Sequence, residues 1–267
     1  MKTALALLLI AGCAWAVLAW LAHRSAFFPM RYPEGWWGVQ QELGAQDVWF
    51  TASDGVTLHA WWLPRKEATV VTLFLHGNAG NVTHRAPAMR EIAAAGSSVL
   101  LLDYRGYGKS EGSPSESGLY RDADAAYSWL LAKGHPESAI VVHGESLGTA
   151  VAVDLAARKR CRALVLEAPF SSARDVAGSV FPGLGPLLMW GFDSAAKIPK
   201  VHVPLLVIHG DADEVIDISL GRRLFQAANS PKQLWVLPRG GHNNIVEAAG
   251  PEYASRLRAF YSIPPAQ

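Results

Sequence analysis

The residues best suited to chemistry lie in the stretch Gly144-Glu145-Ser146-Leu147-Gly148. An apolar, strand-like run precedes it at residues 139–142, and a helix-like run rich in small residues follows it. The two glycines suit a sharp turn from strand to helix, because a Cβ at either position would collide as strand and helix close on each other. A serine held at such a turn exposes its hydroxyl. Ser146 is therefore the candidate nucleophile.

A serine nucleophile needs a base, and the base needs an acid that orients it. His242 lies in a glycine-rich loop between a strand-like and a helix-like run, which suits a base that must reach a distant serine. Four carboxylates follow the apolar, strand-like run at residues 205–208, and among them Asp213 is the favoured acid. Asp211 suits a turn, Asp217 suits a helix cap, and Glu214 is a further alternative.

An oxyanion that forms on an attacked acyl carbon needs N–H donors placed in advance. One candidate is the backbone N–H of Leu147, directly after the serine, and the other comes from Asn78 in the stretch Leu73-Phe74-Leu75-His76-Gly77-Asn78. We expect the other histidines that end strands, His76, His143 and His209, to be satisfied by the backbone of their turns.

The elements around these residues alternate between strand and helix. We expect a hairpin around Asp54-Gly55 and then strands at residues 70–75, 98–102, 139–142, 163–166, 205–208 and 233–237. We expect helices at residues 82–95, 119–133, 147–160, 219–228 and 251–261. This alternation predicts one α/β domain, with a mostly parallel sheet, an antiparallel N-terminal hairpin and helices on both faces. The candidate residues would then meet at the carboxyl edge of the sheet.

The N-terminal segment is apolar. Residues 3–22 carry no charge and are long enough to cross a membrane, so we expect a single-pass signal anchor at residues 1–24, with its orientation undecided. The stretch Ile10-Ala11-Gly12-Cys13 resembles a lipoprotein cleavage site, but the apolar run continues for nine residues beyond Cys13, which favours the anchor. We expect a juxtamembrane segment at residues 25–45, a catalytic domain at residues 46–267, and a short cap at residues 169–203.

Composition excludes several classes of protein. Half of the 267 residues are hydrophobic and 18% are charged, which argues against disorder. The formal net charge of +1 gives no electrostatic reason to bind nucleic acid. The sequence contains no His-Glu-x-x-His motif and no cluster of cysteines and histidines, so we expect neither a metal nor another cofactor.

Five motifs in order, FLHGNAGN, LLDYRGYGKSEGSPSE, HGESLG, VIHGDADEVI and GGHNN, resemble the α/β-hydrolase superfamily, and most closely its membrane-anchored α/β-hydrolase-domain proteins. Relatives include protein depalmitoylases and serine aminopeptidase-like hydrolases. The resemblance implies Ser146 as nucleophile, Asp213 as acid, His242 as base, and Asn78 with Leu147 as oxyanion donors. It implies no role for Glu145.

The resemblance predicts a serine hydrolase of carboxylic esters or thioesters. The apolar stretch VFPGLGPLLMWGF in the cap is either an acyl-binding lid or a short helix that covers the sheet. A lid would favour a small-molecule or lipid-like acyl substrate, or an acylated protein. The alternatives are a peptidase of the serine aminopeptidase type and a catalytically inactive protein that uses the fold for binding.

Overall fold

The computed structural model describes residues 2–264, except for the side chains of residues 2, 4–8 and 11. The strands are β1 (Phe28–Pro29), β2 (Gln46–Thr51), β3 (Thr57–Leu63), β4 (Val70–Leu75), β5 (Ala79–Gly80), β6 (Ser97–Asp103), β7 (Ile140–Glu145), β8 (Ala163–Glu167), β9 (Leu205–Gly210) and β10 (Lys232–Leu237). The α-helices are α1 (Lys2–Arg24), α2 (Val39–Leu43), α3 (Ala86–Ala94), α4 (Glu116–Ala132), α5 (Leu147–Arg158), α6 (Ala173–Val180), α7 (Gly185–Leu188), α8 (Ser194–Lys197), α9 (Ile218–Ala227), α10 (Ile245–Ala249) and α11 (Glu252–Tyr261). The 3₁₀ helices are η1 (Val82–Arg85), η2 (Glu137–Ala139) and η3 (Ile198–Lys200).

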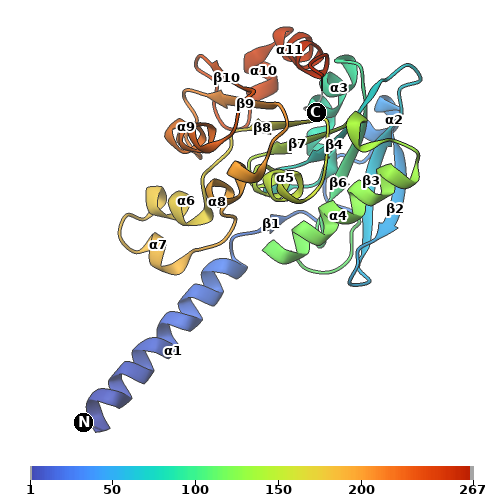
Figure 1. The fold of residues 1–267 in the computed structure, drawn as a ribbon. Coiled ribbons are helices and arrows are strands. Elements are labelled where there is room, and N and C mark those ends of the chain that lie inside the picture. Colours follow the sequence, from blue (N-terminus) through green and yellow to red (C-terminus); the bar gives the residue numbers. More distant parts are fainter. Residues whose placement is uncertain (1, 265–267) are drawn as a thin grey trace.

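Eight strands form one sheet in the order β10-β9-β8-β7-β4-β6-β3-β2. The pairs β2–β3 and β3–β6 are antiparallel, and the other pairs are parallel. This arrangement confirms the predicted mostly parallel sheet with an antiparallel N-terminal hairpin at one edge. The parallel strands β4, β6, β7, β8 and β9 all end at the same edge (Figure 1).

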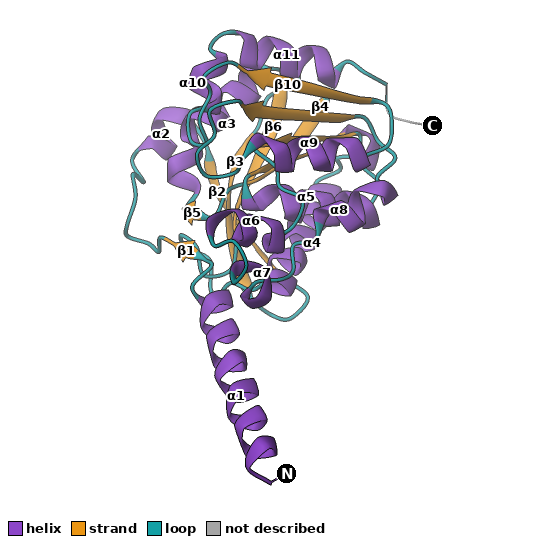
Figure 2. Cartoon of the chain, turned by 90° about the vertical axis from the view of Figure 1, so that its left-hand side faces the viewer, coloured by secondary structure: helices purple, strands orange, loops and turns teal. Residues whose placement is uncertain are grey.

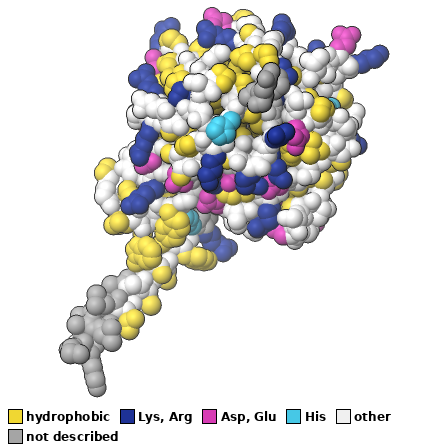
Figure 3. Space-filling model, in the orientation of Figure 1, with side chains coloured by type: hydrophobic (Ala, Val, Ile, Leu, Met, Phe, Trp, Pro, Cys, Tyr) yellow, Lys and Arg dark blue, Asp and Glu magenta, His cyan; other side chains and the backbone are white. Residues whose placement is uncertain are grey.

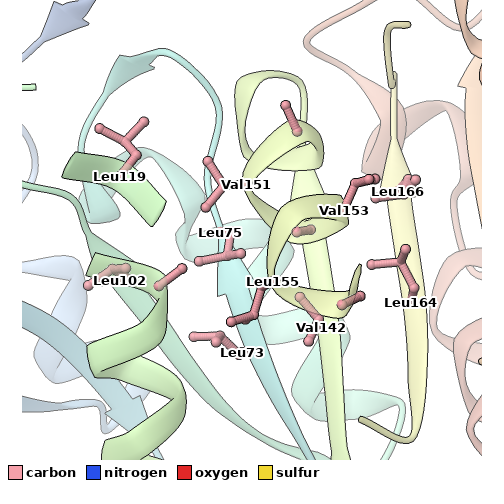
Figure 4. Packing of buried hydrophobic residues seen from close by; sticks show 14 of the residues in the cluster. Leu73, Leu75, Leu102, Leu119, Val142, Val151, Val153, Leu155, Leu164 and Leu166 are labelled. Carbon is pink, nitrogen blue, oxygen red and sulfur yellow. The ribbon is translucent and has the colours of Figure 1, made fainter. Parts of the chain in front are cut away.

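Helices cover both faces of the sheet because its central strands are apolar on both faces. Every residue of β4, β6, β8 and β9 is buried. One core cluster joins the sheet to α4, α5 and α9, and a second joins it to α3, α10 and α11 (Figure 2). In the first cluster, Val151 and Leu155 of α5 pack against the central strands, as Figure 4 shows.

The expected elements are found with small shifts in their ends, and one expected helix is divided. The segment predicted as a helix at residues 82–95 forms η1 and then α3, with Pro87 in the first turn of α3. Proline has no N–H to continue an existing helix but fits the first turn of a new one, so it separates the two. The cap region at residues 169–203 contains α6, α7, α8 and η3.

Helix α1 extends away from the domain (Figure 1). Among the residues that the structure describes, no helix is long and apolar enough to cross a membrane. This finding gives no support to the anchor predicted at residues 1–24, part of which falls on side chains outside the described residues.

The segment after α1 pairs with the domain. Strand β1 runs parallel to β5, with Phe28 opposite Ala79 and Pro29 opposite Gly80. The backbone N–H of Met30 donates to the carbonyl of Gly80 at 3.1 Å, and this extends the contact. Residues 28–30, which the sequence suggested were part of a juxtamembrane segment, therefore lie against the loop that follows β4.

Candidate active site

Ser146 lies between the end of β7 and the start of α5 in a strained backbone conformation. Its φ is 50° and its ψ is −116°, a region that residues other than glycine rarely adopt. A Cβ on Gly144 would lie 2.4 Å from the carbonyl oxygen of Gly148, and a Cβ on Gly148 would lie 1.9 Å from the carbonyl oxygen of Leu75. The glycines thus let α5 approach its own strand and the neighbouring strand β4, and the turn presents the serine at the sheet edge.

The structure brings the three residues of the expected triad into contact. Nε2 of His242 lies 3.0 Å from Oγ of Ser146, and Nδ1 of His242 lies 2.9 Å from Oδ2 of Asp213. Ser146 follows β7, Asp213 lies in the loop after β9, and His242 lies in the loop after β10. The three loops lie at the same edge of the sheet, as expected for parallel strands.

Asp213 is held as a carboxylate in a defined orientation. Its Oδ1 accepts the backbone N–H groups of Val215 and Ile216 at 2.9 and 2.7 Å. Its Oδ2 also lies 3.3 Å from Nε2 of His209. Burial by itself would raise the pKa of Asp213, but the hydrogen bonds from His209, His242 and the Ile216 N–H outweigh it, so the pKa lies below the usual aspartate value.

The neighbouring aspartates have other contacts. Oδ1 of Asp211 accepts the backbone N–H of Arg239 at 2.6 Å, which closes the turn between the loops after β9 and β10. Oδ1 of Asp217 accepts the backbone N–H of Ser219 at 2.8 Å and caps α9. Both contacts match the turn and cap interpretations made from the sequence, and neither residue contacts the His242 ring.

The three strand-ending histidines differ from one another. Nδ1 of His76 contacts the carbonyl of Gly77 at 2.7 Å, and Nε2 of His209 contacts the carbonyl of Ile216 at 2.9 Å, as expected for turns. His143 instead pairs with the carboxylate of Glu167 at 2.8 Å, so the expectation of a backbone partner was wrong there. The sequence also gave no sign that His209 would contact the acid, because that contact depends on the fold of the following loop.

The loop after β4 is held by side chains that bind its carbonyls. The carbonyl of His76 accepts the hydroxyl of Tyr104 at 3.1 Å, and that of Asn78 accepts the hydroxyl of Tyr107 at 2.8 Å. The carbonyl of Gly77 contacts the His76 ring. These contacts hold the carbonyl groups of the loop, and therefore they also hold the orientation of its backbone N–H groups. The two tyrosines were not predicted as site residues.

The proposed oxyanion donors flank Ser146 in the same pocket. Within the part of the chain that the structure describes, neither the backbone N–H of Asn78 nor that of Leu147 has a hydrogen-bond partner. The side chain of Asn78 points elsewhere, since its Nδ2 donates to the carbonyl of Ala26 at 2.6 Å. The backbone of Asn78 therefore remains available to a bound oxyanion.

A pocket with a volume of about 810 Å³ opens beside Ser146 and His242. Most of its wall is apolar and comes from the end of α1, the segment after it and the cap. The apolar wall includes Trp20, Phe27, Phe28, Phe170, Val176, Phe181, Met189, Trp190, Phe192 and Val215. This volume lies within the range of small-molecule sites in proteins.

Helix α1 contacts the cap directly. The indole N–H of Trp15 donates to the carbonyl of Leu187 at 3.0 Å, and the rings of Trp15 and Trp190 stack at 5.9 Å between centroids. The ring of His23 lies 4.2 Å from that of Trp190. Hydrophobic side chains gather on the surface where α1 meets α7, as Figure 3 shows.

The described residues contain no group of three or more histidine, cysteine, aspartate or glutamate side chains that could hold a metal ion. The polar residues that line the pocket include Ser146, His242, Asn78, Arg85, Glu116 and Glu145. These groups can transfer protons and stabilise charge, and together with the serine they can carry out acyl transfer.

Known proteins resemble this chain in sequence and in fold. The serine aminopeptidase (S33) family matches residues 65–197. An uncharacterized protein of Mycobacterium tuberculosis, Rv2307c, is 41% identical over 220 residues, which cover 80% of this chain and 78% of that protein. The mouse α/β hydrolase domain-containing protein 17C is 36% identical over 233 residues, which cover 85% of this chain and 71% of that protein.

The solved structure of the Pyrococcus furiosus esterase Pf2001 superimposes with a TM-score of 0.73 at 22% identity, over 88% of this chain and 97% of the esterase. At this identity the likeness concerns the fold. The sequence relatives, the family match and the sheet topology agree with one another. The chain belongs to the α/β-hydrolase superfamily and is a hydrolase.

Proposed function

We propose that this chain is a serine hydrolase that cleaves carboxylic esters or thioesters. In this proposal Ser146 is the nucleophile, His242 is the general base and Asp213 orients and stabilises the histidine. The observation that carries the proposal is the unbroken chain of contacts from Oγ of Ser146 through the His242 ring to the Asp213 carboxylate, at 3.0 and 2.9 Å.

The chemistry follows from these contacts. Nε2 of His242 accepts the hydroxyl proton as Oγ of Ser146 attacks the acyl carbon, and Asp213 stabilises the imidazolium that forms. The same proton then passes to the departing alcohol or thiol, which leaves an acyl group on the serine. Water deprotonated by His242 attacks this acyl-enzyme and releases the acid.

The negative charge on the attacked oxygen needs donors. We assign this role to the backbone N–H groups of Asn78 and Leu147, since both residues line the pocket and neither N–H has a partner in the described structure. The loss of one such donor typically lowers kcat by about 10² to 10³. The contacts that hold the loop after β4 therefore affect the rate through the position of this donor.

The apolar wall of the pocket supports an acyl chain as the part of the substrate that binds there. Burial of one methylene contributes about 0.8 kcal/mol, or about fourfold in kcat/KM. With p-nitrophenyl esters from acetate to palmitate, we expect kcat/KM to rise with chain length until the pocket is filled. Lipid-like esters, thioesters and acylated proteins all carry such chains.

The peptidase alternative has less support at the site. A peptidase that removes N-terminal residues needs a free carboxylate to bind the substrate ammonium group. Of the pocket glutamates, Glu145 pairs with Arg85 at 2.9 Å, and Glu116 accepts the Phe192 N–H and the Tyr120 hydroxyl on one of its two oxygens, Oε1, at 2.7 Å each. Comparison of aminoacyl amides with acyl esters of the same size tests this directly.

A fluorophosphonate probe, which reacts with activated serines, tests the proposal. We expect wild-type protein to be labelled, Ser146→Ala and His242→Ala to lose labelling, and Ser179→Ala to label normally. Ser179 is the matched control because it is an exposed serine on α6. Folded wild-type protein that resists the probe and hydrolyses no ester would contradict the proposal and favour the inactive binding protein.

A further inference from the structure

An ion pair lies directly beside the proposed nucleophile. Nε and Nη2 of Arg85 donate to the two carboxylate oxygens of Glu145 at 3.0 and 2.9 Å, a two-point contact that fixes both side chains. Glu145 is the last residue of β7 and directly precedes Ser146, and Arg85 is the last residue of η1, sixty residues earlier. The side chain of Glu145 is 22% exposed and that of Arg85 is 13% exposed, so water screens the pair weakly.

The same guanidinium also binds the loop that carries Asn78. Its Nη1 donates to the carbonyl of Ala79 at 2.6 Å. This is the one carbonyl of residues 76–79 that neither a tyrosine nor the His76 ring engages. Arg85 therefore joins two segments that are distant in sequence, namely the loop after β4 and the turn that holds Ser146.

Gly77 shows how tightly these segments meet. A Cβ at this position would lie 2.9 Å from Oε1 of Glu145, 3.0 Å from Nη2 of Arg85 and 3.3 Å from Cβ of Ser146. The backbone of Gly77 is thus packed between the ion pair and the serine. A movement of the pair would shift the adjacent N–H of Asn78 relative to Ser146.

The charge of the pair also matters. An unpaired carboxylate beside Ser146 would repel the oxyanion that forms there, whereas the guanidinium neutralises it. Burial alone would raise the pKa of Glu145, but Arg85 outweighs burial and lowers the pKa, so the glutamate stays ionised and in need of its partner. The Asp213 carboxylate, by contrast, contacts Nδ1 of His242, on the side of the ring away from Ser146.

We infer that Arg85 and Glu145 form a positioning pair for acyl transfer: Arg85 holds the Asn78 loop against the Ser146 turn and cancels the charge of Glu145 where the oxyanion develops. This inference rests on the proposed serine-hydrolase function. It assigns no contact between either residue and the reacting atoms. Both residues act through the backbone donors and through the local field.

Steady-state kinetics of the full chain with p-nitrophenyl butyrate test the inference. We expect Arg85→Gln to lower kcat ten- to a hundredfold with KM changed less than threefold, since the misplaced donor acts on the transition state. Glu145→Gln removes the charge but keeps an amide oxygen for Arg85, so we expect a smaller decrease. Arg158→Gln, which breaks an ion pair on α5 with Asp154, is the matched control and should leave kcat unchanged.

The double variant separates charge from structure. In Arg85→Gln the charge of Glu145 is left without its partner. If that charge opposes the oxyanion, the double variant Arg85→Gln with Glu145→Gln should have a kcat several times higher than Arg85→Gln alone. Added guanidinium ion should likewise raise the kcat of Arg85→Ala, but not of Arg85→Ala with Glu145→Gln. A merely structural role would give neither effect.

Several outcomes would overturn the inference. The pair has no positioning role if both single variants keep kcat within twofold of wild type. The charge of Glu145 has no part in that role if the double variant is no faster than Arg85→Gln. If thermal unfolding shows that the Arg85 variants do not fold, Glu145→Gln decides by itself, and an unchanged kcat there refutes the role. If wild-type protein cleaves no ester and resists the fluorophosphonate probe, the proposed function has failed instead.

Discussion

Replacement of Asp213 by asparagine tests the proposed triad with almost no change in shape. Oδ1 of Asp213 accepts two backbone N–H groups, from Val215 and Ile216. An asparagine would keep its oxygen on these donors and place its NH₂ group on Nδ1 of His242. Because an NH₂ group only donates, Nδ1 would have to accept, and the ring proton would move to Nε2. There it blocks removal of the Ser146 proton.

The size of the effect follows from the contact distance. Nδ1 of His242 lies 2.9 Å from Oδ2 of Asp213. With an effective dielectric constant of about 20, an imidazolium and a carboxylate at this distance attract by about 6 kcal/mol, and by about 4 kcal/mol if the charge centres lie 4 Å apart. At 1.36 kcal/mol per factor of ten, we expect Asp213→Asn to lower kcat by about 10³ to 10⁴.

The assay is hydrolysis of p-nitrophenyl butyrate, with the purity of each variant checked by active-site titration. Asp211→Asn is the matched control, because Asp211 lies in the same loop but its Oδ1 accepts the backbone N–H of Arg239. We expect this control to stay within a few-fold of wild type. A kcat for Asp213→Asn above one tenth of the wild-type value, or an equal loss in Asp211→Asn, would refute the assignment of the acid.

Three further predictions concern stability and reactivity. Gly148→Ala places a Cβ 1.9 Å from a carbonyl oxygen of β4. We expect this variant to lose about 3 kcal/mol of its free energy of unfolding, which lowers Tm by roughly 6 to 12 °C. Gly38→Ala is the control, because its new Cβ meets nothing within 4 Å, and it should unfold near the wild-type temperature. The pKa of Asp213 is lower in the folded chain than in the unfolded chain, so this group contributes stability above about pH 4 that is lost as the pH falls further. The difference in the free energy of unfolding by urea between wild type and Asp213→Asn should therefore be constant from pH 6 to about pH 5 and should shrink from there to about pH 2. A difference that stays constant over the whole range would contradict this. Burial raises the pKa of the Cys161 thiol to about 12, so in a Cys13→Ser variant we expect a thiol reagent at pH 8 to react with Cys161 only after unfolding, and rapid labelling of folded protein would be the contrary result.

The sequence by itself determined the features that depend on neighbouring residues. The turn around Ser146 was predictable because glycines at 144 and 148 are local requirements of a strand that turns sharply into a helix. The parallel sheet was predictable because its central strands are short, continuous apolar runs, which follow from burial on both faces. The order of strands also indicated that Ser146, Asp213 and His242 would end at one edge.

Only the tertiary structure decided which distant groups meet. Four carboxylates follow β9 within seven residues, and the fold of that loop, not its composition, turns Asp213 to His242 and leaves Asp217 to cap α9. Arg85 and Glu145 are separated by sixty residues and carry no motif that links them. The pairing of β1 with β5 similarly joins the N-terminal segment to the loop of Asn78. Such contacts depend on how strands and loops pack in three dimensions, and local patterns in a sequence do not determine that packing.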